Sequence, residues 1–459
     1  MTAIHALTSA DGRPPHIVIV GAGFAGLEAA KALARTGADV TIIDRRNYHL
    51  FQPMLYQVAT ASLSQADVAV SIRSLFSRNA NVEMLYDEVV DIDLDSRFIH
   101  TRDNAQQYYD YLIIATGSEY NYFGHEDWPR HAPGLKTLDD AGRIRTSILS
   151  AFEKAETTDD ARLQKELLTF LIVGAGPTGV ELAGSITEIV NEGLGDFRHI
   201  NPDLVEVLLI EAGPSVLATF PDTIRRYTHD ALERRGVNVR LNQPVVSIAG
   251  NGIYLEDEFV PASTMIWCAG TRATPAGRWL KAKTARNGAV LVEPDLSLPD
   301  HPEVFVAGDA AAVTCKDGHL PALAAVAKQQ GRYLGRVIAA RMRGLDPAEP
   351  FRYRDYGTMA TIGRGAAAAD FGFMQLTGFL AWLLWGLVHI YYLIGFRNRL
   401  AVFTAWIWTM LRLRRRNWLI TDLPMEDYIA RQQALDTDRR KHNQPGPDPP
   451  EGETRRSPH

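Results

Sequence analysis

The sequence predicts an α/β protein with two parallel-sheet domains, the second inserted in the first, followed by a helical C-terminal segment. Three observations lead to this fold. A glycine motif that directly follows a run of β-branched residues occurs twice, further strand-like runs end in small residues, and the C-terminal region combines aromatic with basic residues. A chain of 459 residues is also long enough for about three domains of roughly 150 residues each.

The composition excludes several classes of protein. Apolar residues make up 46% of the chain and charged residues 22%, which is ordinary for a globular protein and excludes a wholly disordered or multi-span membrane chain. The two cysteines, Cys268 and Cys315, exclude a disulfide scaffold and a multi-cysteine metal site, so we expect no metal. The net charge of −6 argues against non-specific binding to nucleic acid.

The two ends of the chain are expected to lie outside the folded body. Residues 1–15 lack an apolar run of signal-peptide length, so we expect a flexible N-terminus and no export. Residues 436–459 are polar, proline-rich and mixed in charge. Because such a segment buries too little apolar surface to fold, we expect a disordered tail.

The clearest internal signal is the repeated glycine motif. Its first copy runs from His16 to Glu28 and its second from Leu171 to Glu181, with an offset of 153 residues at each glycine and at the glutamate. In both copies a β-branched run predicts a buried strand. A helix-compatible run follows, Leu27–Thr36 in one copy and Val180–Val190 in the other.

Each glycine of the motif has a physical reason. The first makes a tight turn, the second lets backbone N–H groups approach a pyrophosphate, and the third lets helix and strand pack closely. The N-terminus of the helix then offers positive partial charge to the anion. One such motif is a weak signal, but two in register after strands predict that the chain binds two nucleotides. The glycines are Gly21, Gly23 and Gly26 in the first copy and Gly174, Gly176 and Gly179 in the second.

An acidic residue is expected to close each unit by accepting a hydrogen bond from a ribose. Asp44 ends a strand-like run 18 residues after Gly26, and Glu211 ends another 32 residues after Gly179. The extra length lies in residues 191–204, which read as an inserted loop. The alternative is that both acids are solvated strand ends. Since a carboxylate at Glu211 would repel a 2′-phosphate, we expect NADH to be preferred over NADPH.

Three further strand-like runs end in small residues, at 111–117, 265–270 and 304–309. In doubly wound sheets, ligands lie at the carboxyl ends of the strands, where glycine lets the backbone approach a flat cofactor. Each run alone is also compatible with a plain strand-to-loop turn. Together with the repeat, the three runs predict two Rossmann-like dinucleotide-binding domains.

These motifs resemble those of the two-dinucleotide flavoprotein reductases. In that superfamily the first cradle holds FAD, and the second, in an inserted domain, holds the nicotinamide nucleotide. Ala115-Thr116-Gly117 and Gly308-Asp309 look like its other signatures, and the aspartate of the second typically contacts the ribityl chain of the flavin.

A narrower resemblance is to the type II NADH dehydrogenases. It is carried by residues 47–59, 174–181 and 196–200 and by the aromatic C-terminus, and it extends from about residue 16 to residue 423. The resemblance implies a membrane-associated NADH:quinone oxidoreductase that does not pump protons. NADH would give a hydride to FAD, and electrons would pass on to a membrane quinone.

The resemblance also implies roles for individual residues. Glu181 would lie near the junction of flavin and nicotinamide, where it positions the nicotinamide or handles protons; alternatively it is a first-turn carboxylate favoured by the helix dipole. Glu28 occupies the same register, and the superfamily gives it no catalytic role. The implied cofactor-binding residues are Gly21, Gly23, Phe24, Ala25, Gly26, Asp44, Arg45, Ala115, Thr116, Gly117, Gly308, Asp309, Gly174, Gly176, Pro177, Thr178, Gly179, Glu181, Glu211 and Gly270.

The expected quinone-site helix departs from the family pattern. This helix usually begins Ala-Gln and carries further glutamines one turn later, whereas the present chain has Ala325 where the first glutamine is expected. The alternative is that its remaining glutamines are solvated helix residues. The candidate quinone-site residues are Ala325, Lys328, Gln329 and Gln330.

Cysteine usage separates this chain from related enzymes. Disulfide reductases need a cysteine pair near the flavin, and the region after the first unit has none. A sulfide:quinone oxidoreductase, the second enzyme interpretation, would need two or three reactive cysteines. We expect Cys268 to be a buried strand residue and Cys315 to be incidental. A third interpretation is a non-catalytic dinucleotide sensor.

The C-terminal region predicts contact with a membrane. Residues 371–421 contain six arginines, no acidic residue and five of the eight tryptophans. Phe379–Phe396 is an uncharged stretch of 18 residues whose helix would be about 27 Å long, against a hydrocarbon core of about 30 Å. Three interpretations stay open: a helix lying in one leaflet, a single span and a dimer interface. A one-sided apolar stripe is formed by Leu400, Phe403, Trp406, Ile407, Met410 and Leu411.

The expected organisation follows from these signals. The location would be the cell inner membrane, with the protein held peripherally or monotopically on the cytoplasmic side. The expected partners are NADH, a quinone and membrane lipid, and a homodimer is a further candidate. The segments are a flexible N-terminus at 1–15, an FAD-binding domain at 16–125 and 271–345, an NADH-binding domain at 126–270, a membrane-associating domain at 346–435 and the tail at 436–459.

Overall fold

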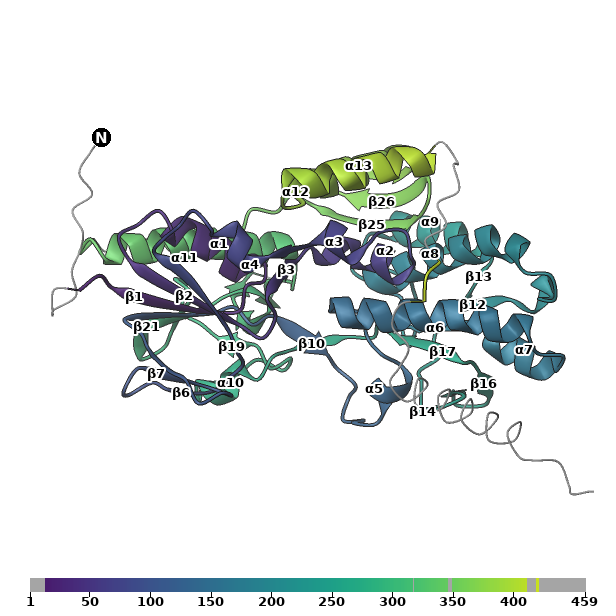
Figure 1. The fold of residues 1–459 in the computed structure, drawn as a ribbon, viewed down its shortest axis with the longest axis horizontal. Helices are drawn as coiled ribbons and strands as arrows, with labels where there is room; N and C mark the ends of the chain where they lie inside the picture. Colours follow the sequence, from purple (N-terminus) through teal and green to yellow (C-terminus); the bar gives the residue numbers. More distant parts are fainter. Residues whose placement is uncertain (1–12, 317, 346–348, 411–417, 421–459) are drawn as a thin grey trace, which may run out of the picture. The chain divides into compact units, whose positions relative to one another are not determined.

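The computed structural model describes residues 13–316, 318–345, 349–410 and 418–420, and the described residues up to Trp418 belong to one compact unit. Its largest sheet has the strand order β20-β21-β9-β1-β2-β5, and Figure 1 labels β1, β2 and β21 of this sheet. All neighbours in it are parallel except β20 and β21. The strands are β1 (His16–Val20), β2 (Asp39–Asp44), β5 (Val82–Tyr86), β9 (Tyr111–Ile114), β20 (Ser297–Leu298) and β21 (His301–Val306).

A second parallel sheet, with the order β13-β12-β11-β17, lies between β9 and β21 in the sequence. The predicted insertion of one doubly wound domain in another is therefore confirmed. At both crossings the chain forms short strands, and these two strands pair with each other as β10 (Ser118–Tyr120) and β18 (Thr271–Ala273). The strands of the second sheet are β11 (Thr169–Val173), β12 (Glu206–Ile210), β13 (Val237–Arg240) and β17 (Thr264–Trp267).

The helices that follow the two glycine motifs begin earlier than predicted. α1 (Phe24–Leu33) and α8 (Pro177–Gly193) both start directly after the second glycine, which acts as an extended N-cap. The interpretation of residues 191–204 as a loop is partly wrong. α8 continues to Gly193, and the 3₁₀ turns η2 (Leu194–Asp196) and η3 (Pro202–Leu204) follow it. Trp418 packs directly on Gly193 at the end of this helix, at a place where a Cβ would overlap the indole ring.

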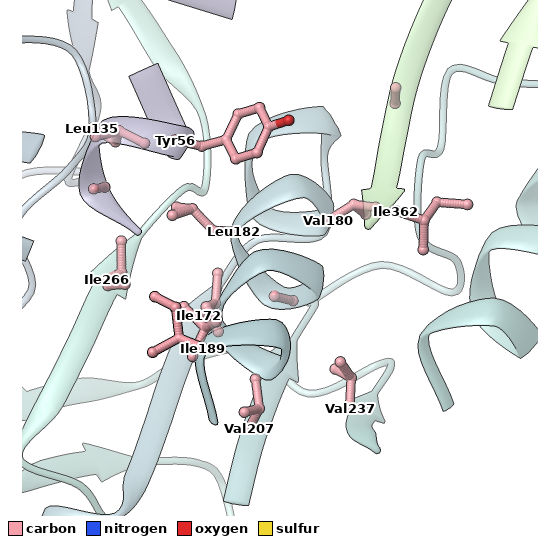
Figure 2. Close-up of a cluster of buried hydrophobic side chains, with 14 of the residues drawn as sticks. Tyr56, Leu135, Ile172, Val180, Leu182, Ile189, Val207, Val237, Ile266 and Ile362 are labelled. Atoms are coloured by element: carbon pink, nitrogen blue, oxygen red, sulfur yellow. The ribbon is translucent and has the colours of Figure 1, made fainter. Parts of the chain in front are cut away.

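The second domain has a dry core between its sheet and α8. Val180, Leu182 and Ile189 are helix residues that belong to this cluster of buried side chains. Figure 2 shows them together with Ile172 of β11, Val207 of β12 and Ile266 of β17. Tyr56 and Ile362 come to the same cluster from distant parts of the sequence, so the second cradle helix is packed on more than one side.

Different elements cover the two cradle helices. α1 packs along α11 (Ala324–Arg341), and Gly331 is needed there because a Cβ would overlap the carbonyl oxygen of Ala25 (Figure 1). α8 packs instead against β25 (Thr358–Gly363), where a Cβ on Gly184 would overlap the carbonyl oxygen of Ile362. Such close approaches fix the helix positions to within a few tenths of an ångström.

The C-terminal region is only partly helical. Its antiparallel sheet, which the sequence analysis did not predict, consists of β25, β26 (Ala366–Asp370) and β27 (Gln375–Gly378). The uncharged stretch forms α12 (Phe379–Tyr392), which ends before Leu393, and a second helix follows as α13 (Phe396–Met410). Trp382 and Trp406 stack with ring centroids 4.3 Å apart and join the two helices.

The surface of these helices is unusually apolar. No helix in the part of the chain that the structure describes is both long and apolar enough to cross a membrane. Most of the predicted stripe is exposed, although Trp406 is half-buried, and Leu411, the arginines between 412 and 416 and the 436–459 tail lie outside the described residues. The exposed apolar residues of this region are Phe373, Met374, Phe379, Leu380, Leu387, Tyr391, Tyr392, Phe396, Leu400, Phe403, Ile407, Trp408 and Met410, named here the apolar face.

The remaining elements are short, with the exception of α6 and α9. The helices are α2 (Leu55–Ala59), α3 (Gln65–Val68), α4 (Ile72–Leu75), α5 (Trp128–His131), α6 (Leu138–Glu156), α7 (Ala161–Leu167), α9 (Asp222–Glu233) and α10 (Ala276–Trp279). The strands are β3 (Tyr48–Leu50), β4 (Ala69–Ser71), β6 (Val89–Asp93), β7 (Phe98–Thr101), β8 (Gln106–Tyr108), β14 (Ser247–Ala249), β15 (Gly252–Tyr254), β16 (Phe259–Pro261), β19 (Val290–Leu291), β22 (Ala311–Ala312), β23 (Thr314–Cys315) and β24 (Gly318–His319).

Candidate active site

The first glycine of each motif makes the predicted turn. Gly21 has a φ of +98° and Gly174 a φ of +99°, a region that favours glycine. A Cβ on Gly21 would lie 2.5 Å from the carbonyl oxygen of Ala115, and one on Gly174 would lie 2.7 Å from the amide nitrogen of Ala269. Both turns therefore require glycine for their backbone angle and for their contact with the neighbouring strand end.

The second and third glycines behave differently from the first. A Cβ on Gly23 or Gly176 would meet nothing within 4 Å, so these two positions are open toward the space at the helix N-terminus. A Cβ on Gly26 would overlap the carbonyl oxygen of Gly21, and one on Gly179 would overlap that of Gly174. Open backbone at a helix N-terminus suits a pyrophosphate, so both cradles fit a dinucleotide.

The two acidic residues have the same role in the two cradles. Asp44 Oδ2 accepts a hydrogen bond of 2.7 Å from the Ala22 N–H, and Glu211 Oε2 accepts one of 2.7 Å from the Ala175 N–H. Burial raises the pKa of Asp44 against the effect of its backbone hydrogen bonds. Because an ionised carboxylate has about four acceptor positions, each acid can hold its cradle and still accept from a ribose. The idea that they are merely solvated strand ends is wrong.

The two equivalent glutamates have opposite electrostatic environments. Glu28 accepts hydrogen bonds of 3.1 Å from Lys31 Nζ and 2.6 Å from Arg332 Nε. Burial alone would raise the pKa of Glu28, but these two cations outweigh it and lower the pKa. No ion pair of Glu181 is found within the described ranges, and burial raises its pKa to about 8. Glu28 is therefore ionised at neutral pH, whereas Glu181 is mostly protonated.

Two further titratable groups lie near Glu181. Burial, and secondarily the charge of Glu181, raise the pKa of Tyr56 and of Cys268. Cys268 follows β17 rather than lying in it and is half-buried, so its description as a buried strand residue is wrong. Its N–H still donates to the Val173 carbonyl at 2.7 Å, the bond that ends the β11–β17 ladder beside the turn of the second cradle. Both cysteines are free, and a thiol with a raised pKa is a poor nucleophile.

The loops at the carboxyl ends of β9 and β21 are joined by side chains. Ser118 Oγ donates a hydrogen bond of 2.6 Å to Asp309 Oδ2 and accepts one of 3.0 Å from Lys136 Nζ. Thr116 is hydrogen-bonded through its hydroxyl to that of Thr274 at 2.6 Å. Sequence reasoning missed Lys136, Ser118 and Thr274, because a lone lysine before a helix start and two hydroxyl residues, one at the start of β10 and one just after β18, form no recognisable pattern.

The other predicted cofactor residues lie around the two cradles. Phe24 and Ala25 open α1, Pro177 and Thr178 open α8, and Gly270 adopts a φ of +87° just after β17. Ala115 is buried, and Gly117 and Gly308 have positive φ at the ends of β9 and β21. Arg45 is exposed, and its only ion pair within the described residues is with Glu88 at 4.0 Å. The role of each as a cofactor ligand stays a prediction.

Two of the candidate quinone-site residues hold backbone segments in place. Gln330 is buried and accepts a hydrogen bond of 2.6 Å from the Gly308 N–H, so it positions the loop of Asp309. Gln329 accepts from the Arg354 N–H at 3.0 Å and donates to the Arg354 carbonyl at 2.8 Å. The alternative of solvated helix glutamines is therefore wrong for Gln330. Ala325 and Lys328 are half-buried near the start of α11.

A series of aromatic and histidine rings connects the first cradle with α12. His49 Nδ1 is hydrogen-bonded to the Ala22 carbonyl at 2.8 Å, and its ring contacts Phe24 edge-on. Phe51 contacts Phe24 and also His389 of α12, and His389 stacks on Trp385 with ring centroids 4.2 Å apart. Sequence reasoning quoted the 47–59 segment for its family likeness, but it did not foresee the contact with α12.

His49 and Trp385 each bury a polar atom that no described residue satisfies. These atoms are His49 Nε2 and Trp385 Nε1. Burial lowers the pKa of His49 and of His389 to about 4, so both imidazoles are neutral at physiological pH. Since buried polar atoms are normally hydrogen-bonded, these two are available to a polar group of a bound ligand.

The fold and site define a class of protein with two dinucleotide-binding cradles in two parallel-sheet domains. The model of the pyridine nucleotide-disulphide oxidoreductase family matches residues 15–331, and that of the NDH2 C-terminal domain matches residues 356–415. The type II NADH:quinone oxidoreductase Ndh of Mycobacterium tuberculosis is 40% identical over 430 residues, which cover 90% of this chain and 92% of the relative. The chain therefore belongs to the pyridine nucleotide-disulphide oxidoreductases and, within them, to the type II NADH:quinone oxidoreductases.

Solved structures share the fold. NDH2 of Plasmodium falciparum in complex with NADH matches with a TM-score of 0.81 at 22% identity, covering 89% of this chain and all of that one. The sulfide:quinone oxidoreductase of Aquifex aeolicus matches with a TM-score of 0.69 at 19% identity, covering 84% of this chain and 92% of that one. At such identities the likeness extends to the fold alone, so the second match does not support sulfide oxidation here.

Proposed function

We propose that this protein oxidises NADH and reduces a membrane quinone through a bound FAD. The observation that carries the proposal is the pair of open glycine cradles, each with its acid in place, in a chain of this family. FAD, when bound, supplies the acceptor for hydride and the donor for the quinone. No acid–base dyad is needed for the hydride step, so the absence of one from the described site is consistent with it.

The residues of the chain have distinct tasks in this reaction. Gly23 and Gly176 expose the backbone N–H groups that hold the two pyrophosphates, and Asp44 and Glu211 bond the riboses. FAD belongs to the first cradle and NADH to the second. The Lys136–Ser118–Asp309 series presents a cation and hydroxyl beside the first cradle.

Glu181 is the residue that we assign to the junction of the two cofactors. With a pKa of about 8 it carries a proton at neutral pH and can give or take one near that pH. Its charge also raises the pKa of Cys268 and of Tyr56, which supports this assignment because Cys268 lies beside the turn at Gly174. A neutral carboxyl there avoids placing a negative charge beside a group that receives hydride.

The apolar face is assigned to the membrane. Phe373, Leu380 and Phe396 are 87%, 67% and 81% exposed, values that an aqueous surface does not favour for side chains of this size. Each arginine near the face would contribute about 1 kcal/mol to the free energy of binding to anionic lipid. We place the protein on the cytoplasmic side of the inner membrane. The FAD-binding domain would comprise residues 16–125 and 271–345, the NADH-binding domain residues 126–270 and the membrane-associating domain residues 346–435. A homodimer would cover part of the apolar face.

One experiment tests the redox function. The purified protein is mixed with NADH without oxygen, and the flavin absorbance is followed; a short-chain quinone is then added. We expect bleaching by NADH and recovery on quinone. Bleaching by sulfide in place of NADH would favour a sulfide:quinone oxidoreductase. Binding of both nucleotides without bleaching would favour a non-catalytic dinucleotide sensor. A preparation without flavin would refute all three.

A second experiment tests the membrane assignment. Leu380→Asp, Phe396→Asp and the double variant place charge at highly exposed positions of the apolar face, so they should fold and retain flavin. We expect flotation with anionic vesicles to fall sharply in the double variant. Tyr86→Asp is the matched control, because Tyr86 lies on β5 and is 63% exposed. This variant should float with the vesicles as wild type does. Unchanged flotation of the double variant would refute the assignment.

A further inference from the structure

The start of α11 retains a single free polar side chain. Ala325 replaces the glutamine expected there, Gln330 is bonded to the Gly308 backbone, and Gln329 is bonded to the Arg354 backbone. Lys328 is the exception. Within the described part of the chain its ammonium group has no carboxylate within 4.0 Å, and its Nζ lies 4.1 Å from the centroid of the Tyr392 ring.

Lys328 lies between the first cradle and the apolar face. Its charge is one of those that lower the pKa of His49, whose ring is bonded to the Ala22 carbonyl inside the first cradle. Its contact residue Tyr392 is 41% exposed and belongs to the apolar face, next to Tyr391, which is 68% exposed. The Lys328 ammonium group therefore contacts the apolar face at the C-terminal end of α12.

The surroundings of Lys328 keep it close to its deprotonation point. Burial, and after it the neighbouring cations, lower its pKa to about 8 against the opposing effect of Glu28. A lysine that ionises near neutral pH can release a proton readily. The charged or titratable groups that face it are Glu28 and Lys31 of α1, Arg332 of α11, Tyr392 of α12, Arg399 of α13 and His49 of β3.

We propose that Lys328 binds a carbonyl oxygen of the quinone and donates a proton to it, in place of the glutamine that Ala325 replaces. The inference deepens the proposed function and rests on it. NADH supplies two electrons and one proton as hydride, whereas a quinone needs two electrons and two protons to become a quinol. The Lys328 ammonium supplies the second proton to the quinone oxygen, and the neutral amine then regains a proton from water.

The test separates the two halves of the reaction in the full-length protein with FAD bound. Lys328→Met removes the charge at nearly constant volume, and Lys328→Arg keeps the charge but cannot release a proton, because the pKa of arginine exceeds 12. Arg336→Met, at an exposed position on the same helix, is the matched control. Each protein is assayed for flavin bleaching by NADH, for turnover with ferricyanide, which takes electrons without protons, and for turnover with a short-chain quinone.

The expected results distinguish proton donation from a structural role. NADH bleaching and ferricyanide turnover should stay within about twofold of wild type in all variants. Quinone kcat should fall about 100-fold in Lys328→Met, at the lower end of what general acids contribute. Lys328→Arg should keep the KM for quinone close to that of wild type but not recover kcat. Wild-type quinone turnover should decline above about pH 8, and this decline should disappear in Lys328→Met.

Several outcomes would overturn the inference. Quinone turnover of Lys328→Met within twofold of wild type would do so, as would an unchanged decline above pH 8. If Lys328→Met only lost flotation with vesicles, the lysine would be a lipid contact and the inference would be wrong. If wild type bleached with NADH and reduced ferricyanide but not quinone, the proposed function would fail together with the inference.

Discussion

The first cradle is covered by a helix, and the second is covered by a sheet. α11 packs on α1 with Gly331 against Ala25, whereas β25 packs on α8 with Ile362 against Gly184. The two turns, open glycines and acid–backbone bonds agree closely, with acid-to-amide distances of 2.7 Å in both. The backbone that binds a pyrophosphate is therefore independent of the layer placed above it.

The covering layers decide the chemistry of the repeated glutamate. α11 brings Arg332 to Glu28 and keeps that carboxylate charged, while β25 brings only a hydrogen bond from the Thr361 backbone to Glu181. The same residue in the same register is thus a charged ion-pair partner in one cradle and a buried carboxyl with a raised pKa in the other. The repeat places a glutamate at the same position of both cradles, and the covering layers give the two glutamates opposite pKa shifts.

The largest effect is expected from the third glycine of each cradle. Gly26→Ala and Gly179→Ala each place a methyl group on a carbonyl oxygen, a strain that costs roughly 1–3 kcal/mol or more. Gly26→Ala should yield colourless protein, whereas Gly179→Ala should stay yellow but bleach slowly with NADH. Flavin absorbance after gel filtration and stopped-flow bleaching measure the two outcomes. Loss of flavin in Gly179→Ala alone would mean that the cradles are assigned the wrong way round.

The next effect concerns the two acids. Glu211→Ser removes the charged acceptor from the second cradle and should raise the KM for NADH about tenfold, equivalent to about 1.4 kcal/mol. It should also reduce the preference for NADH over NADPH, since the repulsion of a 2′-phosphate is lost. Asp44→Ser is the matched variant in the first cradle and should weaken FAD retention instead. An unchanged nucleotide preference in Glu211→Ser would refute the ribose role.

A smaller effect is expected in the pH dependence of unfolding. Because the pKa of Glu181 is raised from its ordinary value to about 8, its contribution to stability is present below about pH 4.5 and is lost as pH rises toward 8. The pKa of Glu28 is lowered, so its contribution is present above about pH 4.5 and is lost as pH falls below that value.

Glu181→Gln and Glu28→Gln should therefore change the melting temperature with opposite pH dependence. The melting temperature of Glu181→Gln should rise relative to that of wild type, by on the order of 2 °C, as pH rises from 5 to 8.5. Glu28→Gln should have a lower melting temperature than wild type at pH 7 and a similar one at pH 4. Flavin fluorescence during heating measures both, and parallel curves for the two variants would contradict the assigned pKa directions.

The smallest effect is expected from the ion pair of the first cradle. Arg332 is 57% exposed in its side chain, so Arg332→Met should cost no more than about 1 kcal/mol. Its NADH bleaching rate should be unchanged, since Glu28 has no proposed part in the reaction. A large loss of NADH bleaching would show that the charge state of Glu28 matters to catalysis.

Much of the fold was predictable because its signals are local. The first and third glycines of each motif are dictated by backbone geometry and by contacts within one strand–turn–helix unit. Asp44 and Glu211 were likewise found from their position at strand ends, despite the different spacing. The likeness to type II NADH dehydrogenases is confirmed by the family to which the chain belongs.

The features that sequence reasoning missed are contacts between distant segments. The β25–β27 sheet escaped notice because its alanine-rich strands lack strong alternation, and it is defined by packing on α8. Lys136 meets Asp309 only through Ser118, and Phe51 meets His389 only when α12 folds back on the first domain. The residues of each pair are far apart in the sequence, so no local pattern predicts their contact.

The sequence by itself determined the two cradles, their acids and the apolar, basic C-terminal region, because each depends on residues within a few turns of one another. Only the tertiary structure decided which repeated glutamate keeps its proton, which α11 side chain stays free and what lies above each cradle helix. Those properties depend on burial and on neighbouring charge, and both are created when segments hundreds of residues apart are brought into contact.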